Sequence, residues 1–186
     1  MKNNQLKMWI VSALFAAVIA IFAQLTIPLP LIPITGQTFA IGLAVTILGL
    51  RYGSLSVLLY ILLGAIGIPV FSGMSGGLGI ITGPTGGYII GFLPAALVMG
   101  IYLEKTRFTS SHAIIANIIG MCITLLFGAI WLKYFANLSW PAAFTSGIAP
   151  FLIVGVLKAI AAALAGVVVR QRLLSAKLLT TKTVSH

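Results

Sequence analysis

The sequence predicts an all-α integral membrane protein with six transmembrane helices, forming a single membrane domain over residues 1–186. Of the 186 residues, 60% are hydrophobic and 6% are charged, whereas a soluble domain carries roughly 25% charged residues. The mean hydropathy is +1.18, and the apolar runs approach the length of about 20 residues that a membrane helix needs. Lys and Arg also gather at alternate ends of these runs, as cytosolic loops require.

The same composition excludes several other classes of protein. Eleven Lys and Arg stand against one acid, Glu104, but they are scattered between apolar stretches, so we expect no nucleic-acid partner. One cysteine, Cys122, excludes a disulfide within the chain and a Cys-rich metal site. One acid and two histidines leave little for acid–base catalysis. We therefore expect no enzyme, no metal site and no cofactor.

The first span is predicted at about residues 8–27. A signal peptide is the alternative, because Lys2 and Lys7 precede the apolar run. That run is too long for a signal core of roughly 7–15 residues, so we expect it to stay as a helix. The segment Pro28–Gly36 holds three prolines and no charge. It cannot form a regular helix, and we expect it to dip into the membrane or lie across a cavity.

Five further spans follow in order. Arg51-Tyr-Gly-Ser separates the second span from the third, and a Gly-rich, uncharged segment separates the third from the fourth. Glu104-Lys-Thr-Arg107 is the only dense charge cluster between spans, and it precedes the fifth. The predicted spans are 8–27, 37–50, 55–71, 88–103, 113–135 and 148–169, with a basic cytosolic tail over 170–186.

The placement of the cations predicts a multi-pass membrane protein with both termini in the cytosol. Lys133, in the last turn of the fifth span, is the one cation at the opposite ends of the spans. The cations assigned to the cytosolic side are Lys2, Lys7, Arg51, Lys105, Arg107, Arg170, Arg172, Lys177 and Lys182.

Lys158 is the candidate binding residue, because it lies near the middle of the sixth span. An unpaired cation there costs at least about 2.5–3.5 kcal/mol. It could snorkel to an interface, but its reach from mid-span is poor. No Asp or Glu lies in any predicted span, and Glu104 belongs to the cytosolic side. We therefore expect Lys158 to face a cavity and to pair with a carboxylate-bearing ligand.

The Gly-rich segment Ser72–Tyr88 is predicted to bind or gate that ligand. Its glycines let backbone N–H groups approach a ligand closely, and it has few of the polar residues typical of a flexible connection. No Gly-Lys-Ser/Thr follows, so it is not a phosphate-binding loop for ATP. Phe39, Phe71, Tyr88 and Phe92 could line an apolar wall beside it or could simply pack.

Gly73-Met-Ser-Gly76 matches a pattern of intramembrane serine proteases. Such a site needs a histidine within reach of Ser75. His112 is expected at the cytosolic end of the fifth span and Ser75 on the outside, with about 30 Å of hydrocarbon between them. We therefore exclude a protease.

Small residues on the first span offer a surface for another helix. Ala13, Ala16, Ala17 and Ala20 fall at i, i+3, i+4 and i+7, a spacing that permits close helix approach. The partner could be another protein or the chain's own bundle.

Several motifs together resemble the BioY family, the biotin-binding S components of energy-coupling-factor (ECF) transporters, over nearly the whole chain. They are Ile32-Pro-Ile-Thr-Gly-Gln-Thr-Phe39, Leu55-Ser-Val-Leu-Leu-Tyr60, Gly67-Ile-Pro-Val-Phe71, Gly76-Gly-Leu-Gly79 and Gly83-Pro-Thr-Gly-Gly-Tyr-Ile-Ile-Gly-Phe92.

The resemblance implies the ECF S-component fold in the plasma membrane of a prokaryote, and high-affinity capture of biotin near the outer face. It also implies a transmembrane coupling (T) subunit and two ATPase subunits as partners, with docking through an Ala-x-x-x-Ala motif that Ala13 and Ala17 match. Lys158 matches a lysine of the family's sixth helix. The expected ligand-binding residues are Gln37, Thr38, Phe39, Phe71, Ser75, Gly76, Gly77, Tyr88 and Lys158.

Two positions depart from the family's pattern. Gly155 stands where family members often have Asp, and Ile89 stands where some have Arg. The ureido ring of biotin would then be held by neutral groups, and the carboxylate by Lys158 alone. The alternative is an S component or facilitator for another small carboxylate-bearing vitamin.

Overall fold

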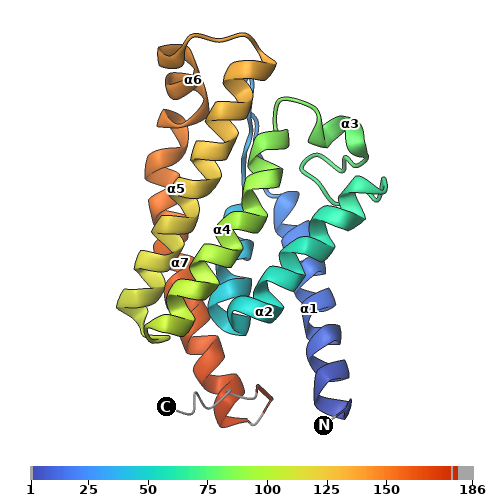
Figure 1. Cartoon of the computed structure of the whole chain (residues 1–186), viewed down its shortest axis with the longest axis vertical. Helices are drawn as coiled ribbons and strands as arrows, with labels where there is room; N and C mark the ends of the chain where they lie inside the picture. The colour runs from blue at the N-terminus through green and yellow to red at the C-terminus, as the bar shows by residue number, and fades with distance from the viewer. Residues whose placement is uncertain (1, 177, 180–186) are drawn as a thin grey trace.

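The computed structural model describes residues 2–176, 178 and 179, which form a bundle of long helices (Figure 1). Lys177 and Lys182, assigned above to the cytosolic tail, lie outside the described residues. The elements are α1 (Lys2–Ala23), β1 (Thr26–Ile27), β2 (Ile34–Thr35), α2 (Gln37–Ala65), α3 (Leu78–Ile81), α4 (Gly86–Lys105), α5 (Ser110–Phe135), α6 (Trp140–Gly147) and α7 (Ala149–Ser175).

The prediction of an all-α membrane protein is confirmed. Five helical segments in the described residues are long and apolar enough to cross a membrane. One of them, α2, contains a break at Gly49 with φ +80° and ψ −170°. The break divides α2 into two arms, which correspond to the second and third predicted spans. The five segments are Gln5–Ala23, Gln37–Ala65, Gly86–Lys105, Ser110–Phe135 and Trp140–Ser175.

Two predicted spans end earlier than expected. The first was predicted to reach residue 27, but α1 ends at Ala23, because Thr26–Ile27 pairs antiparallel with Ile34–Thr35. The third was predicted to reach residue 71, but α2 ends at Ala65. Gly67 then takes φ +101°, a conformation that commonly ends a helix.

The break in α2 is held by two charged side chains. A kink leaves backbone groups without their helical partners, and here Leu50 N–H donates to Glu104 Oε1 at 3.1 Å. Arg170 donates to Ile47 O, and its guanidinium lies 3.6 Å from the centroid of the Phe108 ring. The only acid of the chain is therefore used to cap a helix break.

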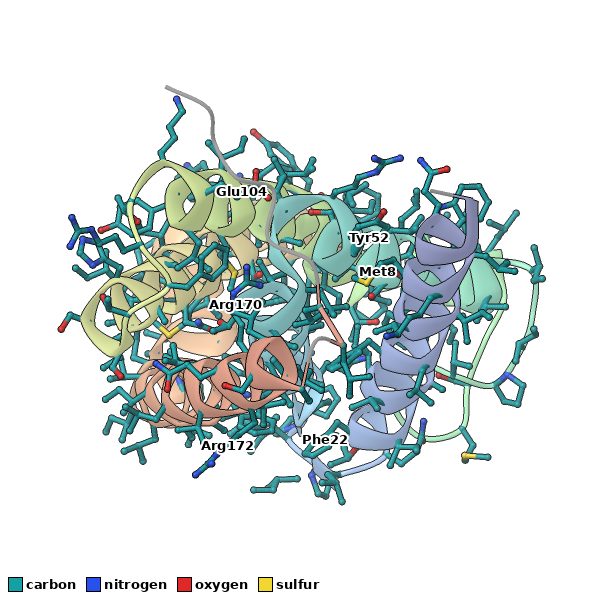
Figure 2. The ribbon with its side chains drawn as sticks, turned by 90° about the horizontal axis from the view of Figure 1, so that it is seen from below. Met8, Phe22, Tyr52, Glu104, Arg170 and Arg172 are labelled. Carbon is teal, nitrogen blue, oxygen red and sulfur yellow. The ribbon has the colours of Figure 1, made fainter. Side chains whose placement is uncertain are left out.

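The start of α1 and the end of α7 lie at the end of the bundle where α2 bends and α4 ends (Figure 1). Figure 2 looks onto this end and shows Glu104, Tyr52, Arg170 and Arg172 on it. We call it the basic end, after Arg51, Lys105, Arg107, Arg170 and Arg172.

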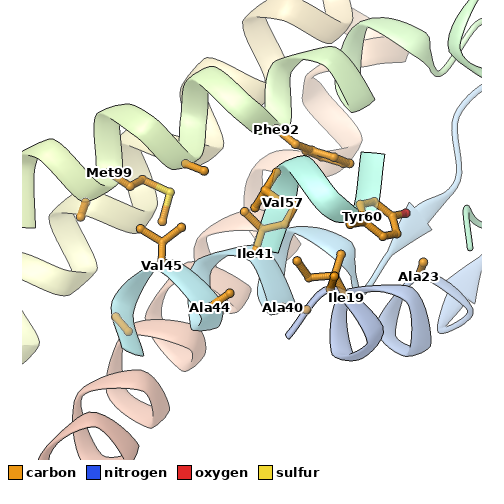
Figure 3. Close-up of a cluster of buried hydrophobic side chains, with 14 of the residues drawn as sticks. Ile19, Ala23, Ala40, Ile41, Ala44, Val45, Val57, Tyr60, Phe92 and Met99 are labelled. Atoms are coloured by element: carbon orange, nitrogen blue, oxygen red, sulfur yellow. The ribbon is translucent and has the colours of Figure 1, made fainter. Parts of the chain in front are cut away.

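Small and branched side chains form the core around α2, which contacts α1, α4 and α7 (Figure 3). Small residues allow close helix packing in a membrane, where lipid is as apolar as the core itself. The labelled core residues, at most 3% exposed, are Ile19, Ala23, Ala40, Ile41, Ala44, Val45, Val57, Tyr60, Phe92 and Met99.

Candidate ligand-binding site

A cavity of about 290 Å³ is lined in part by residues of the β1–β2 segment and the Gly-rich segment. Figure 1 shows these segments toward the end of the bundle opposite the basic end. The size of the cavity is at the lower end of small-molecule sites, which span roughly 300–1,000 Å³. The β1–β2 segment and the start of α2 form one side, the Gly-rich segment another, and α4, α5 and α7 the rest. Six of the nine predicted binding residues line it, namely Gln37, Thr38, Phe71, Ser75, Tyr88 and Lys158.

Lys158 projects from α7 into this cavity rather than toward a membrane surface. Its Nζ donates to Thr35 O at 2.9 Å, which leaves two of its three donors for other partners. Glu104, the one acid of the sequence, caps the α2 break at the basic end. The charge on Lys158 is therefore not balanced by a protein carboxylate, and the cavity is suited to an anion.

Gln37 is a buried amide whose orientation is fixed by two neighbours. Its Nε2 donates to Tyr60 OH, and Thr35 Oγ1 donates to its Oε1 at 2.8 Å. One N–H and one lone pair of the amide are not used by these contacts. Gln37 can therefore offer both a donor and an acceptor to a bound molecule.

Thr38 adds a hydroxyl without a partner. Its Oγ1 is buried and makes no hydrogen bond within the described part of the chain. Most buried polar atoms in proteins are paired, so an unpaired hydroxyl in a cavity wall is a candidate ligand contact.

Tyr88 and Phe71 give the cavity its aromatic walls. The Tyr88 hydroxyl donates to Gly147 O at 2.8 Å, so Tyr88 joins α4 to α6 and presents its ring to the cavity. Phe71 is 1% exposed and packs edge-on against Tyr60, with ring centroids 5.6 Å apart. Both residues therefore contribute apolar surface.

Of the three predicted binding residues at positions 75–77 in the Gly-rich segment, one lines the cavity and two do not. Ser75 lines the cavity, and its Oγ donates to Ser72 O at 2.7 Å. Gly76 and Gly77 are not among the lining residues. A Cβ at Gly76 would lie 2.4 Å from Ile68 O, and Gly77 has φ +96°. These two glycines therefore set the path of the backbone.

Phe39 also lies outside the cavity lining. Its ring packs against Phe22 of α1, with centroids 5.2 Å apart. It therefore joins the start of α2 to α1.

Sequence reasoning missed two side chains that hold the loops of the cavity. Gln24 Nε2 donates to Phe71 O at 3.1 Å, and Gln24 Oε1 accepts from Met74 N–H at 2.9 Å. Trp131 Nε1 donates to Gly83 O at 2.9 Å. The only sequence signals were an amide at the end of an apolar run and an indole near the end of another.

The two departures from the family pattern both lie on the cavity wall, at Gly155 and Ile89. A Cβ at Gly155 would lie 2.5 Å from Met121 Sδ. The Met121 side chain therefore fills the space that a larger residue at position 155 would need, and this part of the wall is apolar.

The small residues of α1 divide into two sets. Ala16 is 1% exposed and packs in the core beside α2, whereas Ala13 and Ala17 are exposed. The face that carries Ala13 and Ala17 is not used within the described bundle.

Among the described residues, Ser75 of the protease pattern has no histidine within reach. His112 Nδ1 is paired with Thr109 Oγ1 at 2.9 Å, at the start of α5 beside the end of α4. Ser75 lies between α2 and α3, and Figure 1 shows α3 at the other end of the bundle, so the two side chains cannot form a nucleophile–base pair.

Comparisons with known proteins agree on one family. The model of the BioY family matches residues 1–175. The "Biotin transporter BioY2" of Lactococcus lactis subsp. cremoris is 40% identical over 160 residues, which cover 86% of this chain and 88% of that protein. The "Probable biotin transporter BioY" of Pyrococcus horikoshii is 39% identical over 161 residues, covering 87% and 92%.

A solved structure shares the fold. The S-component for biotin from an ECF-type ABC transporter superposes with a TM-score of 0.85 at 30% sequence identity, covering 92% of this chain and 94% of that one. These relatives are named as transporters and not as enzymes.

Proposed function

The chain belongs to the BioY family, and we propose that it is the S component of an ECF uptake transporter that captures biotin with high affinity. The observation that carries the proposal is Lys158, a cation in a cavity of about 290 Å³ in a chain whose single acid lies elsewhere. Such a cavity favours a small ligand with one carboxylate.

The parts of biotin match the groups that line the cavity. The carboxylate would pair with Lys158. The bicyclic body and the valeryl chain are apolar and would lie against Phe71, Tyr88 and Phe92. The ureido edge needs both donors and acceptors, which Gln37 and the unpaired Thr38 hydroxyl can supply. Apolar walls with a few placed polar groups are typical of small-molecule sites.

Energy for uptake would come from partner subunits, because the sequence contains no phosphate-binding loop for ATP. We propose a T subunit and two ATPase subunits. The T subunit would dock on the exposed face of α1 at Ala13 and Ala17, where small residues let a second helix approach closely.

The charge distribution supports an orientation in the plasma membrane. The basic end would face the cytosol, together with both termini, and the cavity would open toward the outside. Biotin would then enter the cavity from the extracellular side.

A second candidate is an S component or facilitator for another small carboxylate-bearing vitamin. Gly155 and Ile89 favour it, because the family pattern described above often has an acid at the first position and sometimes a cation at the second, and the described lining of this cavity has neither. Lys158 would still pair with the carboxylate of that vitamin, and the neutral wall would select a ligand whose remaining part differs from that of biotin.

Uptake of radiolabelled biotin tests the proposal in a biotin-requiring bacterial strain that lacks its own transporter. The chain would be expressed with the T and ATPase subunits, with an inactive ATPase pair, or alone. We expect accumulation against a gradient only with active ATPases. Equal uptake in all three strains would instead indicate a facilitator, and no uptake of biotin would indicate another substrate.

A further inference from the structure

An apolar groove of about 590 Å³ runs between α4 and α5 on the outer face of the bundle. Figure 1 shows these two helices side by side. A Cβ at Gly87 would lie 2.1 Å from Trp131 Cβ, so the helices meet closely along the floor of the groove. Its walls, which include no charged residue, are formed mainly by Ile90, Leu126, Phe127, Ile130, Trp131 and Tyr134.

A cation lies at one end of this groove. Lys133 Nζ is 4.7 Å from the ring centroid of Tyr134, which lines the groove, and 5.0 Å from that of Trp140. On α5, Leu126, Ile130 and Lys133 fall at i, i+4 and i+7 and therefore share one stripe of the helix. Lys133 thus continues the groove toward the end of α5.

Within the described residues, no carboxylate neutralises the charge on Lys133. The sequence has one acid, Glu104, which caps the α2 break at the basic end. Lys133 instead lies against two aromatic rings, and Trp and Tyr are enriched at the level of the lipid headgroups. The cation is therefore placed where phosphate groups of a membrane would be.

We propose that this groove binds one anionic phospholipid, with its headgroup phosphate at Lys133 and one acyl chain along Leu126 and Ile130. Lys133 lies about 10 Å beyond Leu126 along the helix axis. An acyl chain that contacts the helix over about 10 Å stays within one leaflet, since the whole hydrocarbon core is about 30 Å thick. The unneutralised lysine favours a lipid with net negative charge over a zwitterionic one.

Native mass spectrometry of the full chain tests the site. The chain would be purified in detergent with an equimolar mixture of phosphatidylglycerol and phosphatidylcholine, and the retained lipids counted. We expect the wild type to retain phosphatidylglycerol preferentially. Lys133→Gln should reduce that retention about fivefold, the usual effect of one lysine near an anionic surface, and should leave phosphatidylcholine unchanged. Lys133→Arg should retain phosphatidylglycerol.

A matched pair of variants on α4 tests the groove itself. Ile90 lies in the groove and is 39% exposed, whereas Ile101 lies outside it and is 41% exposed. Ile90→Trp should displace the lipid, and Ile101→Trp should not. Equal retention of both lipids by the wild type, or equal loss in the two tryptophan variants, would overturn the proposal. A dimer of the chain that Ile90→Trp abolishes would also overturn it, because a second copy would then occupy the groove.

Discussion

Replacing Lys158 with Met removes the cation from the ligand cavity and keeps a side chain of similar length. The Nζ atom donates to Thr35 O at 2.9 Å, and Lys158 is the only charged side chain among the described residues that line the cavity. The carboxylate of bound biotin would then be buried without a partner. Breaking a buried ion pair on one side costs about 3–5 kcal/mol, and each 1.4 kcal/mol is tenfold in affinity. We therefore expect biotin to bind at least about 100-fold more weakly.

Isothermal titration with biotin and with biotin amide measures this effect directly. The amide has the same body and no negative charge. The wild type should prefer biotin strongly, whereas Lys158→Met should lose that preference and bind the amide more tightly than biotin, because only biotin then buries an unpaired charge. The unfolding temperature of the chain without ligand should change little, because the lost hydrogen bond to Thr35 is offset by the removal of an uncompensated charge.

Two results would contradict the assignment of Lys158 as the partner of the biotin carboxylate. If folded Lys158→Met bound biotin within about fivefold of the wild type, Lys158 would not be the partner of the carboxylate. If the variant lost affinity for biotin and for the amide alike, Lys158 would act through its hydrogen bond to Thr35, as a support of the β1–β2 segment.

Three further predictions concern docking and the loops of the cavity. Ala13→Leu with Ala17→Leu should abolish uptake and leave biotin binding intact, because both side chains are exposed on α1; unchanged uptake would show that docking occurs elsewhere. Gln24→Ala should speed biotin dissociation about tenfold. The variant loses two hydrogen bonds to the loop at about 1 kcal/mol each, and part of that loss destabilises the loop while biotin is bound. Stopped-flow fluorescence measures the dissociation rate, and an unchanged rate would contradict the role of Gln24. Gly64→Ala should weaken binding and lower the unfolding temperature, because its Cβ would lie 2.1 Å from the Phe71 ring; a normal affinity would show that the Phe71 ring can move without cost.

The sequence predicted the membrane class and the positions of most helices, because apolar runs and cation placement act over whole segments. It could not predict that the second and third spans join through a break at Gly49. That break depends on Glu104 and Arg170, which contact α2 from α4 and α7. Contacts between distant segments leave no periodic signal in the chain.

Only part of the binding site could be predicted, because most of its contacts also join distant segments of the chain. Lys158 was identified because a cation in an apolar span is costly wherever the span packs. Gln24 and Trp131 were missed, because their role depends on which loop carbonyls lie near them. Phe39 was expected at the ligand and instead packs on Phe22, since a helix start has two faces and the sequence does not say which one meets the cavity.

Titration of the purified chain with biotin is the direct test of what the cavity binds. We expect tight binding that saturates at one biotin per chain, with no ATPase or T subunit present. Pantothenate and lipoate, two other carboxylate-bearing vitamins or cofactors, should not compete at equal concentration. If a folded chain failed to bind biotin and bound one of these competitors, biotin would not be the ligand and the cavity would be assigned to a different one.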